Sequence, residues 1–228
     1  MTFEIFSPKW FYGYDAIFEL VSVVAVILIA WLSYKAYRFT KNKNYKYLTF
    51  SFLLIGLSFI VKTITNLIIY FEPLKEKQVG FLIISYYNIQ RLTMVHDIGY
   101  FFFRITVLLG FLIILLLALK IKDKKEISLL VFFIIISTMF SNSQYFIFHI
   151  TCAFMLNIIF HYFFLNWRKK RTESSLTLAL AFFMILLSQI VFIFVVFNKS
   201  IYVIGEIFQL FGYLVLLYTY LLVLRVHK

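Results

Sequence analysis

Ten residues with ionisable or hydrogen-bonding side chains lie within long apolar stretches of the sequence. A charged side chain near the middle of a membrane costs roughly 2.5–3.5 kcal/mol on insertion scales. Such residues therefore usually face the interior of a helix bundle, where they pair with each other or line a polar cavity. We predict that these residues form a ligand-binding site: Glu19, Lys62, Asn66, Asp97, Tyr100, Arg104, His149, Gln189, Glu206 and Gln209.

Helical spacing groups these polar residues with their neighbours onto shared faces. Side chains three or four residues apart lie on the same side of a helix. The groups are Asp15 with Glu19, Ser58 with Lys62, Thr65 and Asn66, Asp97 with Tyr100 and Arg104, and Glu206 with Gln209 and Tyr213. All of them fall toward one end of their segments, whereas residues 23–32, 107–119 and 214–224 are almost wholly apolar. We expect a polar pocket near one membrane surface, above an apolar floor.

Two other interpretations of the same residues stay open. The polar side chains fix helix packing through hydrogen bonds worth about 0.6–2 kcal/mol each, or they line a proton or ion path. A metal or haem site is not expected, because His149 and His161 are twelve residues and about 18 Å apart on one helix. No nucleotide-binding, metalloprotease, CxxC or hydrolase motif is present, so we expect no cofactor and do not favour an enzyme.

The segments that carry these residues are too apolar for a soluble domain. The 228-residue chain is 63% hydrophobic and 21% aromatic, whereas soluble domains are nearer half apolar. We predict an all-α polytopic membrane protein, because solid apolar runs, unlike alternating ones, satisfy their backbone in lipid as helices. Residues 1–228 then form one domain with seven transmembrane spans, at about 15–37, 46–70, 96–120, 126–142, 144–166, 174–197 and 201–225.

The distribution of basic residues predicts the orientation. Of 22 lysines and arginines, 15 lie in alternate connections and at the C-terminus, and five lie on the opposite side. Basic loops stay in the cytoplasm, so we expect the N-terminus outside, the C-terminus inside and a multi-pass protein of the plasma membrane. The net charge of +12 is explained by topology, and nucleic acid is not an expected partner. Residues 71–95 are predicted to be an outer interfacial or re-entrant segment, with 79–92 roofing the pocket.

The sequence indicates neither a cleavable signal peptide nor a disulfide within the chain. The first apolar run has no basic segment before it and no small-residue cleavage site after it, so no cleavable signal peptide is expected. Cys152 is the single cysteine, which rules out a disulfide within the chain.

Two stretches resemble the first and last spans of prokaryotic multi-span sensor modules. One runs from Ser33 to Thr40 and continues through Tyr45 to Phe59, and the other runs from Gly205 to Tyr213 and ends at Leu222–Arg225. Such modules usually precede a histidine kinase or a nucleotide cyclase. This chain stops at Lys228 without an output domain, so the resemblance implies signalling to a separate protein.

These observations favour a sensor or receptor-like protein that binds a small molecule or a lipid in the outer half of the bilayer. Its cytoplasmic partner would dock on the basic loops 38–46, 120–125 and 168–171. A small transporter or channel subunit is the first alternative. An intramembrane lipid-modifying enzyme and a structural assembly subunit are further alternatives.

Overall fold

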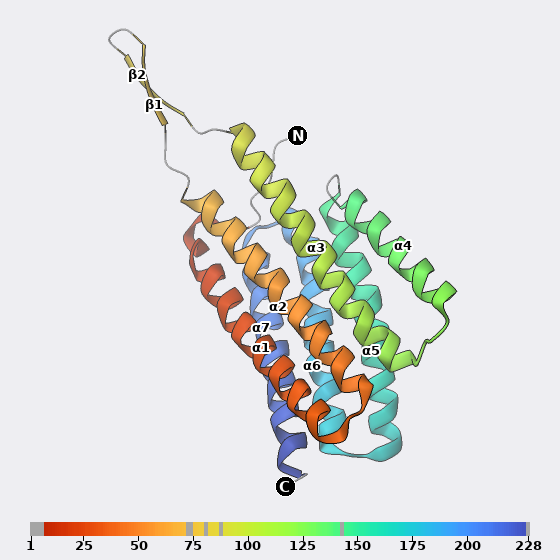
Figure 1. The fold of residues 1–228 in the computed structure, drawn as a ribbon. Coiled ribbons are helices and arrows are strands. Elements are labelled where there is room, and N and C mark those ends of the chain that lie inside the picture. Colours follow the sequence, from red (N-terminus) through yellow and green to blue (C-terminus); the bar gives the residue numbers. More distant parts are fainter. Residues whose placement is uncertain (1–6, 72–74, 80–81, 87–88, 142–143, 227–228) are drawn as a thin grey trace.

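The computed structural model describes residues 7–71, 75–79, 82–86, 89–141 and 144–226. Within these ranges the chain is almost entirely helical (Figure 1). Its seven α-helices, each overlying one predicted apolar run, are α1 (Tyr14–Thr40), α2 (Lys43–Tyr70), α3 (Ile89–Leu119), α4 (Lys124–Phe140), α5 (Tyr145–Lys170), α6 (Glu173–Ile193) and α7 (Ser200–Val226). Two short 3-10 helices, η1 (Lys9–Phe11) and η2 (Phe194–Val196), and two strands, β1 (Lys75–Val79) and β2 (Leu82–Tyr86), complete the described elements.

Six of the described helices are long and apolar enough to cross a membrane, which fits a multi-pass membrane protein. They are α1, α2, α3, α5, α6 and α7. Helix α4 has 17 residues and is therefore about 26 Å long, slightly less than the roughly 30 Å of a bilayer's hydrocarbon core. By length and composition alone, the structure thus supports six spans.

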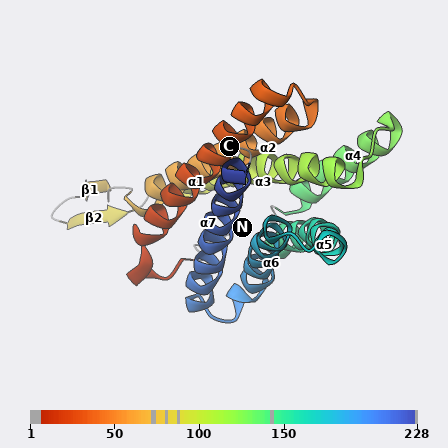
Figure 2. The ribbon, with the colours of Figure 1, turned by 90° about the horizontal axis from the view of Figure 1, so that it is seen from below.

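The six long helices form a closed ring, and α4 lies outside it. Helix α1 packs against α2, α2 against α3, α3 against α5, α5 against α6, α6 against α7, and α7 returns to α1. Helix α4 contacts only the outer sides of α3 and α5 to a substantial extent, and it stands apart when the bundle is viewed along its axis (Figure 2). The closure between α1 and α7 brings together the two ends of the sequence.

The turns at the basic end of the bundle are short and end in basic residues. Lys41 and Arg171 terminate α1 and α5 in the left-handed region, with φ of 55° and 53°, and Lys120 after α3 has φ of 58°. Helices α2 and α4 start with side-chain caps, in which Asn42 accepts from the Asn44 amide and Asp123 from the Lys125 amide, both at 3.0 Å. Chain reversal here therefore places basic side chains at helix C-termini, where the helix dipole favours positive charge.

Glycines let neighbouring helices of the ring approach closely. A β-carbon on Gly110 of α3 would lie 2.6 Å from the Ile55 side chain of α2, and one on Gly212 of α7 would lie 2.5 Å from Ile185 of α6. At the first contact, the Ser51 hydroxyl donates to the Gly110 carbonyl at 2.9 Å. Small residues and such hydrogen bonds are what helix packing in lipid depends on.

An apolar core fills the ring toward its basic end. Its fully buried side chains include Ile29, Phe52, Leu108, Ile159, Ile185 and Leu216, from the six ring helices. The hydroxyls of Ser51 and Thr219 in this region bond to backbone carbonyls of Gly110 and Val215. The expectation of an apolar floor is met by this packing.

The connection between α2 and α3 differs from the predicted roof. Strands β1 and β2 pair antiparallel, with Lys75 opposite Tyr86 and Val79 opposite Leu82. The hairpin projects beyond the ends of α2 and α3 and does not lie over the ring (Figure 1). Residues 89–92 are the first turn of α3, because the helix continues upstream of the predicted start. Residues 72–74, 80–81 and 87–88 of the predicted 71–95 segment lie outside the described residues.

Candidate functional site

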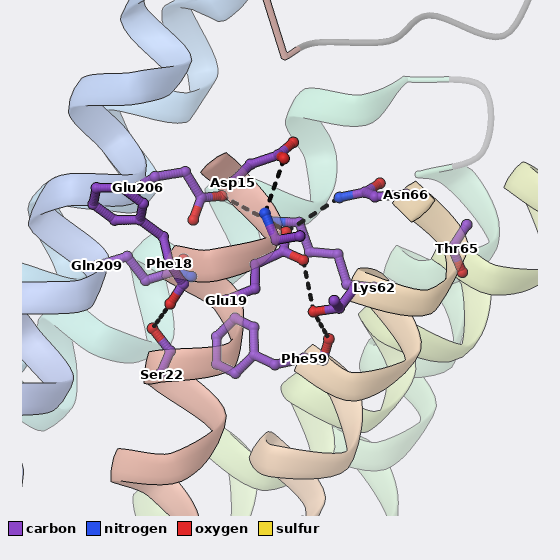
Figure 3. Close-up of polar contacts among 12 residues, drawn as sticks. Asp15, Phe18, Glu19, Ser22, Phe59, Lys62, Thr65, Asn66, Glu206 and Gln209 are labelled. Atoms are coloured by element: carbon purple, nitrogen blue, oxygen red, sulfur yellow. Dashed lines mark hydrogen bonds and ion pairs between the residues drawn. The ribbon is translucent and has the colours of Figure 1, made fainter. Parts of the chain in front are cut away.

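Three charged side chains from three helices meet inside the ring. The ammonium of Lys62 on α2 lies 2.9 Å from Glu19 Oε1 on α1 and 2.8 Å from Glu206 Oε1 on α7 (Figure 3). Glu19 is 0% exposed, and the other two side chains are nearly as buried. Counted along their helices from the end opposite the basic turns, these residues lie about 8–12 Å deep. We call Glu19, Lys62 and Glu206 the charged triad.

Hydrogen bonds extend the triad along α2 and onto α3. Glu19 accepts from the Thr63 hydroxyl at 2.8 Å through Oε2 and from the Asn66 amide at 3.2 Å through Oε1. The Asn66 carbonyl oxygen in turn accepts from the Tyr100 hydroxyl at 2.8 Å. Both oxygens of Glu19 are thus satisfied, which buried carboxylates require.

Aromatic rings surround the Lys62 ammonium on its remaining sides. Its Nζ atom lies 5.6 Å from the centroid of Phe103, 6.0 Å from Phe192 and 5.5 Å from Tyr202. These distances fall within the range of cation–π attraction. The ammonium is therefore held by two carboxylates and by rings from α3, α6 and α7.

A second polar group joins α5, α6 and α7. Nδ1 of His149 lies 2.9 Å from Oε1 of Gln189, and because that oxygen only accepts, the ring must donate from Nδ1. The Gln189 amide donates to Ser188 Oγ at 3.3 Å and to Gln209 Oε1 at 3.4 Å. His149, Gln189 and Gln209 thus form one connected network, as their similar depth predicted.

Arg104 is anchored on the α4–α5 side of the ring. Its Nη1 atom donates to the Ser141 carbonyl at 2.8 Å, and its guanidinium lies 5.8 Å from the Tyr100 ring centroid. The side chain is buried. Arg104 therefore carries a positive charge close to Tyr100, on the side of the ring opposite α1.

A cavity of about 50 Å³ lies between these groups. At about 10–15 Å³ per water centre, it has room for a few water molecules. Its lining comes from α2, α3, α5, α6, η2 and α7: Lys62, Tyr100, Phe103, Arg104, Tyr145, Phe148, His149, Gln189, Phe192, Val195, Tyr202 and Gln209. The two triad carboxylates are absent from this lining. We call this space the central cavity.

A third polar contact lies nearer the N-terminus. Asp15 accepts from the Tyr70 hydroxyl and from the backbone amides of Gly13 and Ala16. The Tyr70 ring stacks on Tyr12 with centroids 4.1 Å apart. Partial burial, with help from Asp15, raises the pKa of Tyr12 above its ordinary value, so this phenol is neutral at physiological pH. The contact fastens the start of α1 to the end of α2.

Most predicted site residues come together, and Asp97 does not. Its side chain is 54% exposed and lies 3.2 Å from the neighbouring His96 ring. Asp97 lies in the early turns of α3, where side chains are only partly covered, so a shared helical face did not bring it to the cavity. Ser58 and Thr65 also stay apart from the network, and their hydroxyls bond to the Ile55 and Val61 carbonyls of their own helix.

The predicted set also missed residues. Thr63 bonds Glu19, and Tyr145 and Tyr202 line the central cavity. The position of Thr63 next to Lys62 in the sequence could have indicated it as a site residue. Adjacent residues of a helix, however, point in different directions. Tyr145 and Tyr202 lie near the ends of their predicted spans, where tyrosines usually sit at the membrane interface. Only the packing of neighbouring helices places them at the cavity.

No metal site is evident in the part of the chain that the structure describes, since no three histidine, cysteine, aspartate or glutamate side chains gather there. Cys152 is buried in the apolar core. The arrangement is suited to holding charge and hydrogen bonds in an apolar frame. Comparisons with protein-family models, with curated proteins and with solved structures found no match.

Proposed function

We propose that this protein is a seven-span receptor-like protein of the plasma membrane, with its N-terminus outside and its C-terminus in the cytoplasm. Six long apolar helices support membrane insertion, and α4 is nearly long enough to be the seventh span. The N- and C-terminal ends of the described chain lie at opposite ends of the bundle (Figure 1), as an odd number of spans requires. The basic turns at Lys41, Lys120 and Arg171 share the C-terminal end, which supports a cytoplasmic position for it.

The central cavity is the proposed ligand site. The observation that carries the proposal is the convergence of Lys62, Arg104 and three hydrogen-bonding side chains from α5, α6 and α7 on one cavity inside the ring. Convergent polar groups within an apolar frame are the usual signature of a small-molecule site. The small volume favours a small ligand over a lipid.

Binding at this position can alter the basic end through the helices themselves. The lining comes from five of the six ring helices, and a ligand that contacts two packings of them differently shifts the population toward one. The basic loops 38–46, 120–125 and 168–171 are the proposed contact with a separate cytoplasmic partner. The resemblance of two segments to sensor modules agrees with this role.

Transport is the alternative function, and the packing below the cavity favours the receptor. A transporter needs a polar path through the inner half of the bundle. The described inner half is instead filled by side chains such as Phe52, Leu108 and Ile185, which are almost fully buried.

The orientation is tested with single cysteines in a Cys152→Ser background. Lys43→Cys lies at the basic end and Lys199→Cys at the opposite end, and both positions are exposed. We expect a membrane-impermeant maleimide to label Lys199→Cys in intact cells and Lys43→Cys only after permeabilisation. The reverse labelling, or labelling of both in intact cells, would contradict the proposed topology.

Access to the cavity is tested on one face of α7. Gln209 lines the cavity, and Leu216, seven residues and about 10 Å further along the same face, is buried in the apolar core. In the Cys152→Ser background, a small charged methanethiosulfonate reagent added outside should modify Gln209→Cys at least ten times faster than Leu216→Cys. Equal rates would remove the central cavity as a ligand site open to the outside.

A further inference from the structure

We infer that the charged triad binds one proton, shared by the carboxyl groups of Glu19 and Glu206, and that the folded ring loses stability when this proton leaves. The triad is thus a proton-binding site in addition to the proposed ligand site. The inference does not require a ligand in the central cavity, because the two carboxyl groups are not part of the lining of that cavity. It depends on the number of charges in the triad, their separation, their burial and the charges around them.

The triad has one more acidic group than it has basic groups. Lys62 Nζ lies 2.9 Å from Glu19 Oε1 and 2.8 Å from Glu206 Oε1 (Figure 3), so with one ammonium and two carboxylates the ionised triad has an excess negative charge. The three side chains are 7%, 0% and 2% exposed. A buried charge without a counter-charge is strongly disfavoured, and a titratable group in such a position usually becomes neutral instead. One proton on the two carboxylates makes the triad neutral.

The two carboxylates are close enough to oppose each other's ionisation. Because both Oε1 atoms bind the same nitrogen, they are at most about 6 Å apart. Two like charges within this range disfavour the doubly ionised state, and the proton that they retain belongs to the pair and not to one residue. The geometry therefore favours a singly protonated pair beside the ammonium.

The other charged groups near the triad do not cancel its excess charge. Asp15 lies one helical turn from Glu19 on α1, and Arg104 of α3 donates to the Ser141 carbonyl on the side of the ring opposite α1. Their charges are opposite in sign, so together they add nothing to the net charge. The remaining titratable neighbours are phenols, a thiol and an imidazole: Tyr70 on α2, Tyr100 on α3, His149 and Cys152 on α5, and Tyr202 and Tyr213 on α7.

Among these neighbours, His149 is the group that becomes positive when it takes up a proton. It shares the cavity lining with two cations, Lys62 and Arg104. Three aromatic rings of α5 and α6 also lie with their centroids 5.0 to 6.0 Å from the imidazole. Like charges and apolar surroundings both disfavour a charged imidazole. The carboxylates are therefore the groups that take the proton.

Water reaches the triad at Lys62. This residue lines the central cavity, which has room for a few water molecules. A proton enters when the ammonium passes one of its protons to a carboxylate and the resulting amine takes a proton from a hydronium ion in the cavity. The net change converts one carboxylate and one hydronium ion into one carboxyl group and one water molecule, and the reverse steps release the proton.

The bound proton links the stability of the fold to pH. A glutamate of an unfolded chain has a pKa of about 4.3 and is ionised at neutral pH. The folded state then binds one proton more than the unfolded state. Stability therefore falls as pH rises, from about pH 4.3 to the pH at which the folded pair releases its proton. At its steepest, one proton changes the unfolding equilibrium constant about tenfold per pH unit.

Infrared spectroscopy of the full chain tests the inference in dodecyl maltoside micelles, because this detergent has no carbonyl group. A protonated carboxyl group gives a C=O stretching band that ionised carboxylates lack. We expect this band in the wild-type protein at neutral pH. It should be lost in Glu19→Gln and in Glu206→Gln, since each variant leaves one carboxylate paired with Lys62. Asp97→Asn alters a carboxylate that is 54% exposed and should keep the band.

Unfolding by sodium dodecyl sulfate at a series of pH values gives the second readout. The unfolding equilibrium constant of the wild-type protein should rise with pH by up to about tenfold per pH unit more steeply than that of Glu19→Gln or Glu206→Gln. The Asp97→Asn control should follow the wild-type protein. Each glutamine variant suffices for the comparison, so one that does not fold leaves the test intact.

Three results would overturn the inference. A wild-type protein without the carboxyl band at neutral pH would have a fully ionised triad. A band that persists in both glutamine variants, or that Asp15→Asn removes, would place the proton elsewhere. Equal pH dependence in the wild-type protein and the glutamine variants would show that the proton is not linked to folding. None of these results depends on labelling of Gln209→Cys, so the proposed ligand site is tested separately.

Discussion

At the scale of single residues, the charged triad is the most consequential feature of this protein. Two carboxylates and one ammonium are buried together, and each depends on the others to offset its desolvation. Buried ion pairs add little net stability, but removal of one partner leaves an uncompensated charge. The triad therefore restricts the relative positions of α1, α2 and α7, because Lys62 must contact Glu19 and Glu206 at the same time.

Replacing Lys62 by methionine should strongly destabilise the protein. The change leaves two buried carboxylates without their cation and should cost about 3–5 kcal/mol, measured as a lower thermal unfolding temperature in detergent or nanodiscs. Lys35→Met, at an exposed position of α1, should have almost no effect. If the triple variant Glu19→Gln, Lys62→Met, Glu206→Gln is no more stable than Lys62→Met alone, the charge explanation is wrong.

Replacing Asp97 by asparagine should change stability by less than about 0.5 kcal/mol, as is usual for surface positions. Its carboxylate is more than half exposed and contacts only His96 among the interactions described above. Thermal unfolding of Asp97→Asn and of Glu19→Gln, measured side by side, checks this. Glu19→Gln alters a fully buried group with three partners and serves as the comparison. A large loss at Asp97 would mean that its carboxylate belongs to the site after all.

At the scale of elements, glycines and turns decide how the helices pack. Close contacts at Gly110 and Gly212 join α3 to α2 and α7 to α6. Gly56 of α2 is different, since a β-carbon there would meet the side chains of α1 at 3.5 Å, an ordinary contact distance. The turns between α1 and α2 and between α5 and α6 use basic residues in the left-handed region, a conformation that glycine adopts more easily.

The glycine contacts predict opposite effects for the same substitution. Gly212→Ala should destabilise the protein by about 1–3 kcal/mol, because the added methyl group meets the backbone of α6 as well as Ile185. Gly56→Ala should be neutral or stabilising by up to about 1 kcal/mol, because alanine favours a helix and has room here. Thermal unfolding of the two variants compares them directly, and equal destabilisation would contradict the close approach of α6 and α7.

The turn after α1 predicts a stabilising change. Lys41→Gly should raise the unfolding free energy by about 1 kcal/mol, because glycine adopts a φ of 55° without the steric cost of a β-carbon. Lys41→Ala removes the same charge and keeps the β-carbon, so it should give no gain. Equal effects of the two substitutions would attribute any change to the charge.

At the scale of the whole molecule, the protein is a ring of six helices with α4 attached outside. The cavity and the triad belong to the ring, and α4 contributes to neither beyond the Ser141 carbonyl at its end. Much of the α4 surface is apolar and uncovered, with Leu129, Phe132 and Phe133 each more than half exposed. In the proposed topology, α4 is an additional membrane crossing. This crossing puts the basic turn between α5 and α6 and the C-terminus on the cytoplasmic side, and lipid covers the outer face of α4.

Lipid contact should therefore differ between α4 and the ring interior. With Trp10, Trp31 and Trp167 replaced by phenylalanine, a Phe132→Trp variant should be strongly quenched by phospholipids with brominated chains. A Phe111→Trp variant, at a position that is 2% exposed, should be quenched weakly. Equal quenching at both positions would show that α4 is covered by protein or that the ring is open to lipid.

Much of this protein was predictable from local patterns in the sequence. The apolar runs predicted seven helical segments, and the polar residues within them predicted burial, since hydrocarbon and an apolar core both exclude unpaired charge. The common depth of Glu19, Lys62 and Glu206 was also predictable, because it depends only on counting residues along each helix.

The tertiary structure alone decided which of these residues meet. Helical periodicity gives the face of a side chain but not the neighbour of that face, so the closure of α1 on α7 and the outside position of α4 could not be deduced. Asp97 and Tyr100 share a face of α3, yet Tyr100 joins the network and the Asp97 side chain is more than half exposed. Hydrogen bonds and ion pairs between distant segments require close packing, and that packing is a property of all the helices together.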